Sequence, residues 1–140
     1  MNSDITRLIN DVEINFLADL FLARYGFDTT AKCYRRFKNT LIILSHDFAD
    51  TETELKAVAG LDGMTASALI SDLENTVAAL PRPMHETFNK YYGAKIHDSD
   101  DAHITMPDNL SVMESIKFLA AVFLTIIICN YPKYEYFEYH

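Results

Sequence analysis

"FLAAVFLTIIIC", residues 118–129, is the most apolar stretch of the sequence and contains no charged side chain. At a rise of about 1.5 Å per residue, a helix of this length spans roughly 18 Å, which is too short for a hydrocarbon core of about 30 Å. Lys117 directly precedes the stretch and Pro132 follows it closely, so neither end extends it favourably into lipid. A helix that is apolar on every side must be surrounded by other helices. The pattern therefore predicts a buried helix at about 111–129 as the axle of a helical bundle, with no transmembrane anchor.

The composition is that of one ordered domain, residues 1–140, with 49% hydrophobic residues and only four glycines and four prolines. Its net charge of -8 argues against nucleic acid or an anionic membrane as the main partner, because both would repel the chain. The N-terminus lacks the basic start and apolar block of a secretory signal, and Cys33 and Cys129 lack paired spacing. We therefore expect a cytoplasmic protein with two buried, reduced thiols.

Periodic apolar residues and capping signals predict the remaining helices, and no strand alternation persists long enough to indicate a sheet. Gly26 is expected to end the first helix in a left-handed conformation. Thr51 and Glu54, and likewise Ser111 and Glu114, have the spacing of a capping box. The fold expected is all-α, with helices at 5–24, 30–48, 51–60, 65–80 and 111–129, one or two turns within 84–93, a polar loop at 94–109, and an aromatic tail at 131–140.

A second stretch, "EINFLADLFLARYGF" at residues 13–27, resembles the first homology region of the Bcl-2 family of apoptosis regulators. That region has an acidic residue, an apolar pair, an aromatic-rich apolar stripe, and a basic or polar residue leading into glycine and an aromatic. The chain fits this pattern loosely at Glu13, Ile14, Phe16, Leu17, Leu20, Leu22, Gly26 and Phe27. The resemblance implies a Bcl-2-like bundle around the apolar helix at 111–129.

The helix expected at 30–48 resembles the family's BH3 motif in its apolar spacing, and "MTASALISDLENTVAAL", residues 64–80, resembles the helix that borders the family's groove. The acidic residue of the motif is displaced, because Ser45 and His46 precede Asp47. Either Arg82 or Lys117 is the cation expected to pair with the aspartate of an incoming BH3 ligand. The groove residues implied are Phe37, Leu41, Leu44, Phe48, Leu69, Leu73, Val77, Arg82 and Lys117.

The Asn-Trp-Gly-Arg signature of the family's groove is missing, and the chain contains no tryptophan. Shortness and the lost signature resemble short viral homologues of the iridovirus or poxvirus kind. The resemblance implies an inhibitor of apoptosis that sequesters BH3 helices of pro-death proteins such as Bim, Bak or Bax. It would act in the cytoplasm of the host cell or at the periphery of mitochondria. A homodimer is expected to cover the exposed groove.

Two other classes of function compete with this interpretation. A helical interaction domain could keep the fold and bind a host signalling adaptor, or associate only with itself, without any BH3 ligand. The cluster "HDSDDAH" at 97–103 brings His97, Asp100, Asp101 and His103 together, but it departs from the calcium-loop pattern and is expected to be a solvated loop. No catalytic motif stands out, so neither an enzyme nor a cofactor or metal is expected.

Overall fold

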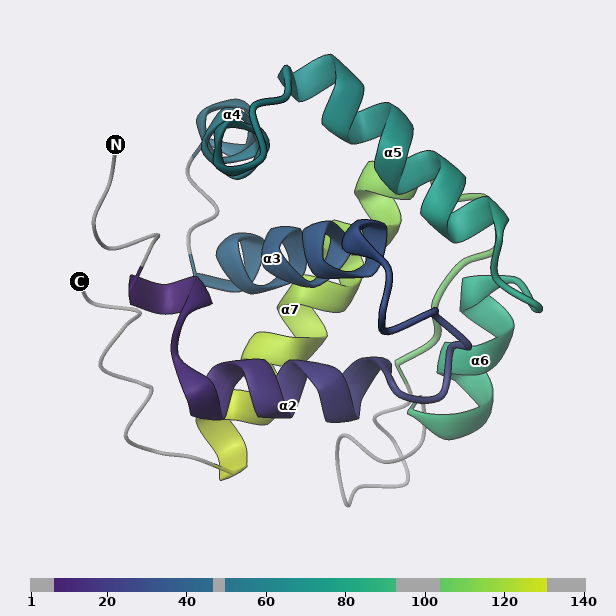
Figure 1. Cartoon of the computed structure of the whole chain (residues 1–140). Helices are drawn as coiled ribbons and strands as arrows, with labels where there is room; N and C mark the ends of the chain where they lie inside the picture. Colours follow the sequence, from purple (N-terminus) through teal and green to yellow (C-terminus); the bar gives the residue numbers. More distant parts are fainter. Residues whose placement is uncertain (1–6, 47–49, 93–103, 131–140) are drawn as a thin grey trace.

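The structure is a computed structural model that describes residues 7–46, 50–92 and 104–130, with side chains described as far as Ile127. Its elements are all helical, as predicted. After a helical turn at 7–9, the chain forms α2 (Val12–Leu22), α3 (Lys32–His46), α4 (Thr51–Leu61), α5 (Ala66–Ala78), α6 (Met84–Tyr91) and α7 (Val112–Asn130). The described residues thus form an all-α bundle (Figure 1).

The centre of the bundle is α3, which contacts α2, α4, α5 and α7. Figure 1 shows α3 between α2 and α4, with α7 crossing behind it. Six consecutive residues of α3, Thr40 to Ser45, are buried. The two hydroxyls in this run donate to carbonyls of the same helix, Thr40 to Arg36 O at 2.8 Å and Ser45 to Ile42 O at 2.6 Å. Because these polar groups are satisfied locally, this part of α3 can be enclosed on every side.

The helix α7 was expected at this central position, and that prediction is wrong. Its bounds agree with the predicted helix, but only one face is buried, whereas Ala121 is exposed and residues 124–126 are half-buried. The buried face packs mainly on α3 and includes Ile116, Leu119, Phe123 and Ile127. The uninterrupted apolar run therefore led to an overestimate of how much of α7 is buried, because apolar side chains are also common at protein surfaces.

The first predicted helix, 5–24, is interrupted in the structure. Asp11 is the N-cap of α2, and its carboxylate accepts a hydrogen bond from Ile14 N at 3.0 Å. Asn15 reinforces the break because its amide donates to Ile9 O at 2.6 Å and to Asp11 O at 2.8 Å. Side chains that compete with the helical ladder start a helix more readily than they continue one. The new start fixes which face of α2 turns inward.

Capping explains the starts of the later helices. The predicted capping box of α7 is confirmed, since Ser111 N donates to Glu114 Oε1 at 2.9 Å and Glu114 N to Ser111 Oγ at 3.1 Å. The predicted start of α5 is also confirmed, with Thr65 as its N-cap. The box predicted at Thr51 is wrong, because Asp50 caps α4 by accepting from Thr53 N at 3.2 Å.

The turn after α2 contacts α6, the segment that precedes α6, and the centre of the bundle. Gly26 has φ +90°, which confirms the predicted left-handed stop, and it lies directly against Pro81 in the segment between α5 and α6. Tyr25 stacks on Tyr92 with ring centroids 6.0 Å apart, and Phe27 packs on Phe37 at 4.8 Å. The turn therefore anchors α2 to both α6 and the centre of the bundle.

Several sequence predictions concern parts that are only partly described. Residues 104–106 are held against α6 through Asn89, which accepts from Met106 N at 2.8 Å and donates to Met106 O at 3.1 Å. Cys33 is a free thiol, half-buried where full burial was predicted, while the side chain of Cys129 lies outside the described residues. The tail 131–140 also lies outside them. Among the described helices, none has the length and apolarity needed to cross a membrane.

Candidate functional site

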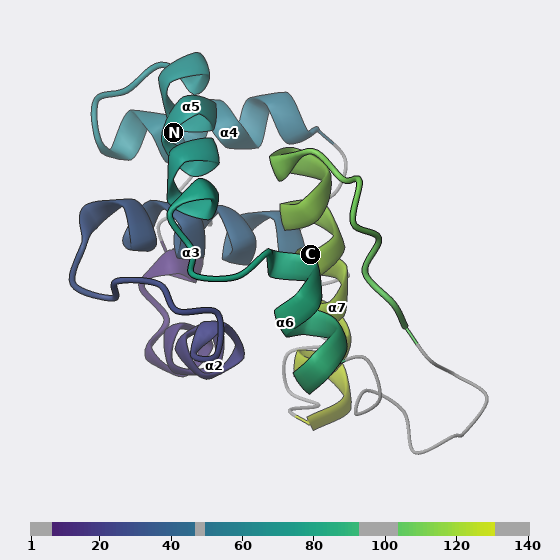
Figure 2. The same cartoon turned by 90° about the vertical axis from the view of Figure 1, so that its right-hand side faces the viewer.

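The predicted groove residues lie together, but they are buried in the core. Phe37, Leu41, Leu69 and Leu73 are 0% exposed and Leu44 is 2% exposed. All five belong to one hydrophobic cluster, in which α3 and α5 are in direct contact. The side chains expected to line an open groove are therefore filled in by the chain itself. Figure 2, turned by 90°, also shows α5 lying across α3.

The other predicted groove residues do not join this cluster in the same way. Val77 is half-buried and packs against the edge of the core, whereas Arg82 and Lys117 are exposed on the α5–α6 turn and on α7. Phe48 lies outside the described residues. The two predicted cations are therefore not brought into a shared pocket with the apolar set.

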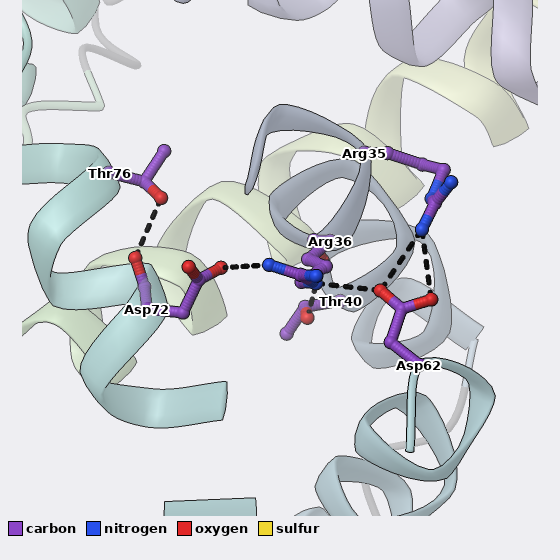
Figure 3. A network of polar contacts seen from close by, with 6 residues as sticks. All are labelled: Arg35, Arg36, Thr40, Asp62, Asp72 and Thr76. Atoms are coloured by element: carbon purple, nitrogen blue, oxygen red, sulfur yellow. Dashed lines mark hydrogen bonds and ion pairs between the residues drawn. The ribbon is translucent and has the colours of Figure 1, made fainter. Parts of the chain in front are cut away.

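Arg35, Arg36, Asp62 and Asp72 form a charged cluster, here called the clamp, on α3 and its neighbours (Figure 3). Arg36 Nε donates to Asp62 Oδ2 at 2.6 Å, and an Arg36 terminal nitrogen lies 3.4 Å from Asp72 Oδ2. Arg35 adds two contacts to the Asp62 carboxylate at 2.9 and 3.1 Å. Asp62 is the C-cap of α4 and Asp72 lies on α5, so the clamp ties three helices together. The sequence analysis did not identify these four residues as a cluster.

The electrostatics of the clamp follow from its hydrogen bonds. The hydrogen bond from Arg36 is the largest cause that lowers the pKa of Asp62, and Arg35 acts in the same direction. Reciprocally, the hydrogen bond to Asp62 raises the pKa of Arg36. The side chains of Arg36, Asp62 and Asp72 are only 20%, 18% and 24% exposed, so solvent screens the clamp less than an ordinary surface pair.

Because of the clamp, we expect the folded chain to lose stability in acid. Because the pKa of Asp62 is lower in the folded chain than in the unfolded one, its contribution is complete above the unfolded value of about 3.9 and is lost as the pH falls through the folded value. At pH 7, Asp62→Asn should lower the free energy of unfolding by about 1–2 kcal/mol. Urea unfolding of both proteins between about pH 7 and pH 3 should show this difference shrinking as the pH falls. A difference that stays constant would contradict the assignment.

Among the described residues, three of the large exposed apolar side chains lie along α2, away from the clamp. Val12, Phe16 and Leu20 are 82%, 60% and 54% exposed and follow one another at intervals of four residues, so they form one line on the helix. We call these three residues the α2 stripe. In both Figures 1 and 2, α2 lies at the edge of the bundle, with α3 on its inner side. Large apolar side chains aligned on an outer face are typical of protein-interaction sites.

The α2 stripe was missed because the sequence offered two apolar lines on the same helix. The helical spacing allowed Phe16 and Leu20 to face the core, but the face that packs inward is formed by Ile14, Leu17, Ala18, Phe21 and Leu22. Both lines of apolar residues have helical spacing, and their hydropathy does not indicate which line packs inward. The one usable signal was Asp11, whose side chain starts the helix anew and so changes its phase.

Charges around the α2 stripe are distributed unevenly along the helix. Exposed Glu13 lies at its N-terminal end. At the C-terminal end, the Arg24 guanidinium lies over the Tyr91 ring at 4.6 Å, and the Lys90 ammonium lies over the same ring at 5.2 Å. Asp19, beside the middle of the stripe, is compensated by Lys38 at 3.2 Å and accepts a hydrogen bond from the Tyr34 hydroxyl at 2.6 Å. Arg24 and Lys90 thus place two cations beside the C-terminal end of the face.

An open pocket of about 600 Å³ lies between Asp19 and the start of α3. Lys32, Arg35 and Lys38 contribute cations to its wall. However, Lys38 is bound to Asp19, which lines the same pocket, and Arg35 is bound to Asp62. With two of its three cations already paired, the pocket has little charge left with which to bind an anion.

The acidic cluster at 97–103, with His97, Asp100, Asp101 and His103, lies outside the described residues. Within the residues that the structure does describe, no three histidine, cysteine or acidic side chains are grouped so as to hold a metal ion.

Comparison with known proteins identifies no relative of the chain: no family model, no curated protein sequence and no solved structure matches it.

Proposed function

We propose that the chain is a helical protein-interaction domain that binds a helix of its protein partner through the α2 stripe. The observation that carries this proposal is a contrast in exposure. Residues expected to bind a ligand in a groove, such as Phe37 and Leu41, are 0% exposed, whereas Phe16 is 60% exposed. The role is one of binding rather than catalysis. It corresponds to the interaction-domain alternative to BH3 sequestration.

The α2 stripe is large enough to contribute to binding. Burying a complete valine, leucine or phenylalanine side chain stabilises a complex by about 1.5–3 kcal/mol. Since more than half of each side chain is exposed, the stripe would contribute roughly 4 kcal/mol before the entropic costs of association are subtracted. The acidic net charge of -8 would favour partners with basic flanks.

Sequestration of BH3 helices, which the Bcl-2 resemblance implies, is the second proposal and makes a stricter demand. A ligand helix would have to displace α5 from α3, exposing Leu69 and Leu73 and breaking the contacts of Arg36 with Asp62 and Asp72. The energy for this opening would be subtracted from the affinity of every ligand. Because these contacts would have to break first, we rank BH3 sequestration below binding at α2.

A dye that fluoresces on apolar protein surfaces tests the first proposal without requiring a known partner. The dye should bind the native chain, and Phe16→Glu should reduce its fluorescence by about twofold or more, because the charge interrupts the α2 stripe. Leu61→Glu is the matched control, since Leu61 is also exposed, at 42%, but lies on α4. Far-ultraviolet circular dichroism should show that both variants stay folded. An equal effect of the two substitutions would contradict the proposal.

Calorimetric titration with synthetic BH3 peptides, including one from Bim, separates the two proposals. We expect no binding tighter than about 10 µM, because the residues of the predicted groove are already packed. Sub-micromolar binding by the folded chain would establish the groove function instead. Phe16→Glu serves as the control here, since a groove ligand should be indifferent to the outer face of α2.

A further inference from the structure

Within the described residues, three cationic side chains from separate segments gather around one tyrosine, Tyr91. The Arg24 guanidinium lies 4.6 Å from the centroid of the Tyr91 ring, and the Lys90 ammonium lies 5.2 Å from it. Arg82 directly follows Pro81, which lies against the turn after α2. Figure 1 shows the end of α2 pointing toward α6. We call the four residues the Tyr91 cluster: Arg24, Arg82, Lys90 and Tyr91.

The pKa of Tyr91 reports the combined effect of these cations. A hydrogen bond with Lys90 is the largest cause that lowers it, followed by the charge of the same ammonium. The charges of Arg24 and Arg82 lower it further, so both lie within electrostatic reach of the phenol oxygen. The field that favours a phenolate at this point would equally favour an external anion.

None of these cations forms an ion pair with a carboxylate in the described part of the chain. The nearest acid along α6 is Glu86, one turn before Lys90, and no described ion pair joins the two. The cations that do contact a carboxylate lie on α3 and α4: Arg35, Arg36, Lys38 and Lys56. Arg24, Arg82 and Lys90 are exposed, so their N–H groups are accessible to a ligand.

Helix dipoles explain only part of the arrangement. Arg24 follows the C-cap of α2, and Lys90 lies in the last turn of α6, where a cation is favourable. Arg82, however, directly precedes Pro83, the N-cap of α6, where the helix dipole repels a cation. The position of Arg82 near the same ring is therefore not explained by α6 itself.

From this arrangement, we propose that the Tyr91 cluster is a binding site for a phosphate group. The ring of Tyr91 contacts the Arg24 guanidinium on one flat face, which leaves the N–H groups at its edge free to donate to two phosphate oxygens. Lys90 and Arg82 supply the further positive charge that a dianion favours. The proposal goes beyond the proposed function, because it uses no residue of the α2 stripe.

The net charge of -8 limits the ligand to a small one. Charges on a protein surface are screened beyond about 8 Å at physiological ionic strength, so the cations of the cluster dominate for a small anion in contact with them. A polyanion such as nucleic acid would also meet the acidic remainder of the surface and be repelled. The ligand that fits is a phosphate group, either free or carried by a small organic molecule.

Titration with inorganic phosphate, followed by amide NMR correlation spectra, tests the site directly. At about pH 7.5, where phosphate is mainly the dianion, we expect saturable shifts at the four residues of the Tyr91 cluster. Because the site is exposed, the dissociation constant should be on the order of 1–10 mM. Sodium chloride at the same ionic strength is the control. Shifts that chloride reproduces would overturn the proposal, since screening alone would explain them.

Matched substitutions test which cations bind. Arg82→Gln should weaken phosphate binding by about fivefold or more. Lys56→Gln removes the same charge from α4, whose described contacts are with α3 and α5, and should change the affinity by less than about twofold. The NMR spectra also show whether both variants stay folded. Equal effects of the two substitutions would overturn the proposal.

The chain's own carboxylates provide a further test. Asp98, Asp100 and Asp101 follow α6 in the sequence. Replacing all three with asparagine should leave the affinity for phosphate within about threefold, a change of the size that lost long-range repulsion produces. Phosphate binding that appears only in this variant would overturn the proposal, because these carboxylates would then be the anions that the cations bind.

Phenyl phosphate distinguishes the two sources of the phosphate group. If it binds about tenfold more tightly than inorganic phosphate, the site takes a phosphate carried by an organic molecule. If it binds equally or more weakly, the site takes the free anion. Absence of saturable binding by either compound would overturn the site, while the dye test of the α2 stripe would be unaffected, because Val12, Phe16 and Leu20 take no part.

Discussion

Phe37→Ala is expected to lower the free energy of unfolding by about 4 kcal/mol, a large share of the stability of a domain of this size. Phe37 is 0% exposed, and its ring packs on Phe27 with centroids 4.8 Å apart. Removing it would leave a cavity between α3 and the turn after α2, which the neighbouring side chains cannot refill without strain. Urea unfolding at equilibrium measures the loss.

Phe16→Ala provides the matched control, because it deletes the same atoms from a side chain that is 60% exposed. We expect it to change the free energy of unfolding by less than about 1 kcal/mol. Similar small losses for the two variants would contradict the structure, since they would mean that Phe37 lies on an accessible groove wall. The comparison therefore distinguishes a core residue from a ligand-binding one.

Gly26→Ala is expected to destabilise the chain by about 3 kcal/mol. The φ of +90° at Gly26 is strained for any residue with a Cβ, and a Cβ there would lie 2.7 Å from Pro81 Cγ. The proline belongs to the segment between α5 and α6, so relief of the overlap would separate that segment from the end of α2. Thermal or urea unfolding should show the loss.

Two other glycines calibrate this effect. Gly63 has φ +67°, but a Cβ added there would meet no atom within 4 Å, so Gly63→Ala should cost about 1 kcal/mol through the backbone alone. Gly60 lies within α4 and is equally unobstructed, so Gly60→Ala should be neutral or stabilise the chain by about 0.5 kcal/mol. If Gly26→Ala behaved like Gly63→Ala, the close approach of Pro81 would be wrong.

Local signals predicted the helices well. The capping box of Ser111 and Glu114 and the cap at Thr65 occur as expected, because each needs only atoms within one turn of the chain. The left-handed stop at Gly26 is local in the same sense. Where two local solutions competed, as at Asp50 and Thr51, the sequence did not decide between them.

The position of each helix in the bundle was less predictable. The α7 segment is the most apolar, yet α3 occupies the centre, because the hydroxyls of Thr40 and Ser45 are satisfied by their own helix. The first half of α3 is basic, so the hydropathy averaged over the whole helix did not indicate a central position. How far a helix is buried depends on which other helices pack against it, whereas hydropathy indicates only how strongly one of its faces avoids water.

The candidate site was missed for a related reason. The spacing of Phe37, Leu41 and Leu44 is the same whether the residues face a ligand or another helix of the chain, and here they face the core. On α2, the inward phase depends on the cap at Asp11. The clamp of Arg36 with Asp62 and Asp72 joins residues distant in sequence, and no local pattern predicts such a pairing.

A single tryptophan placed at position 16 tests directly whether the α2 face is open while the predicted groove is filled. The native chain contains no tryptophan, so Phe16→Trp would provide the only indole signal. At about 1 µM, we predict long-wavelength emission and efficient quenching by iodide or acrylamide, as for an indole in water. Short-wavelength emission that is protected from both quenchers at that concentration would show that the chain covers its own α2 face, and would contradict an open interaction surface there.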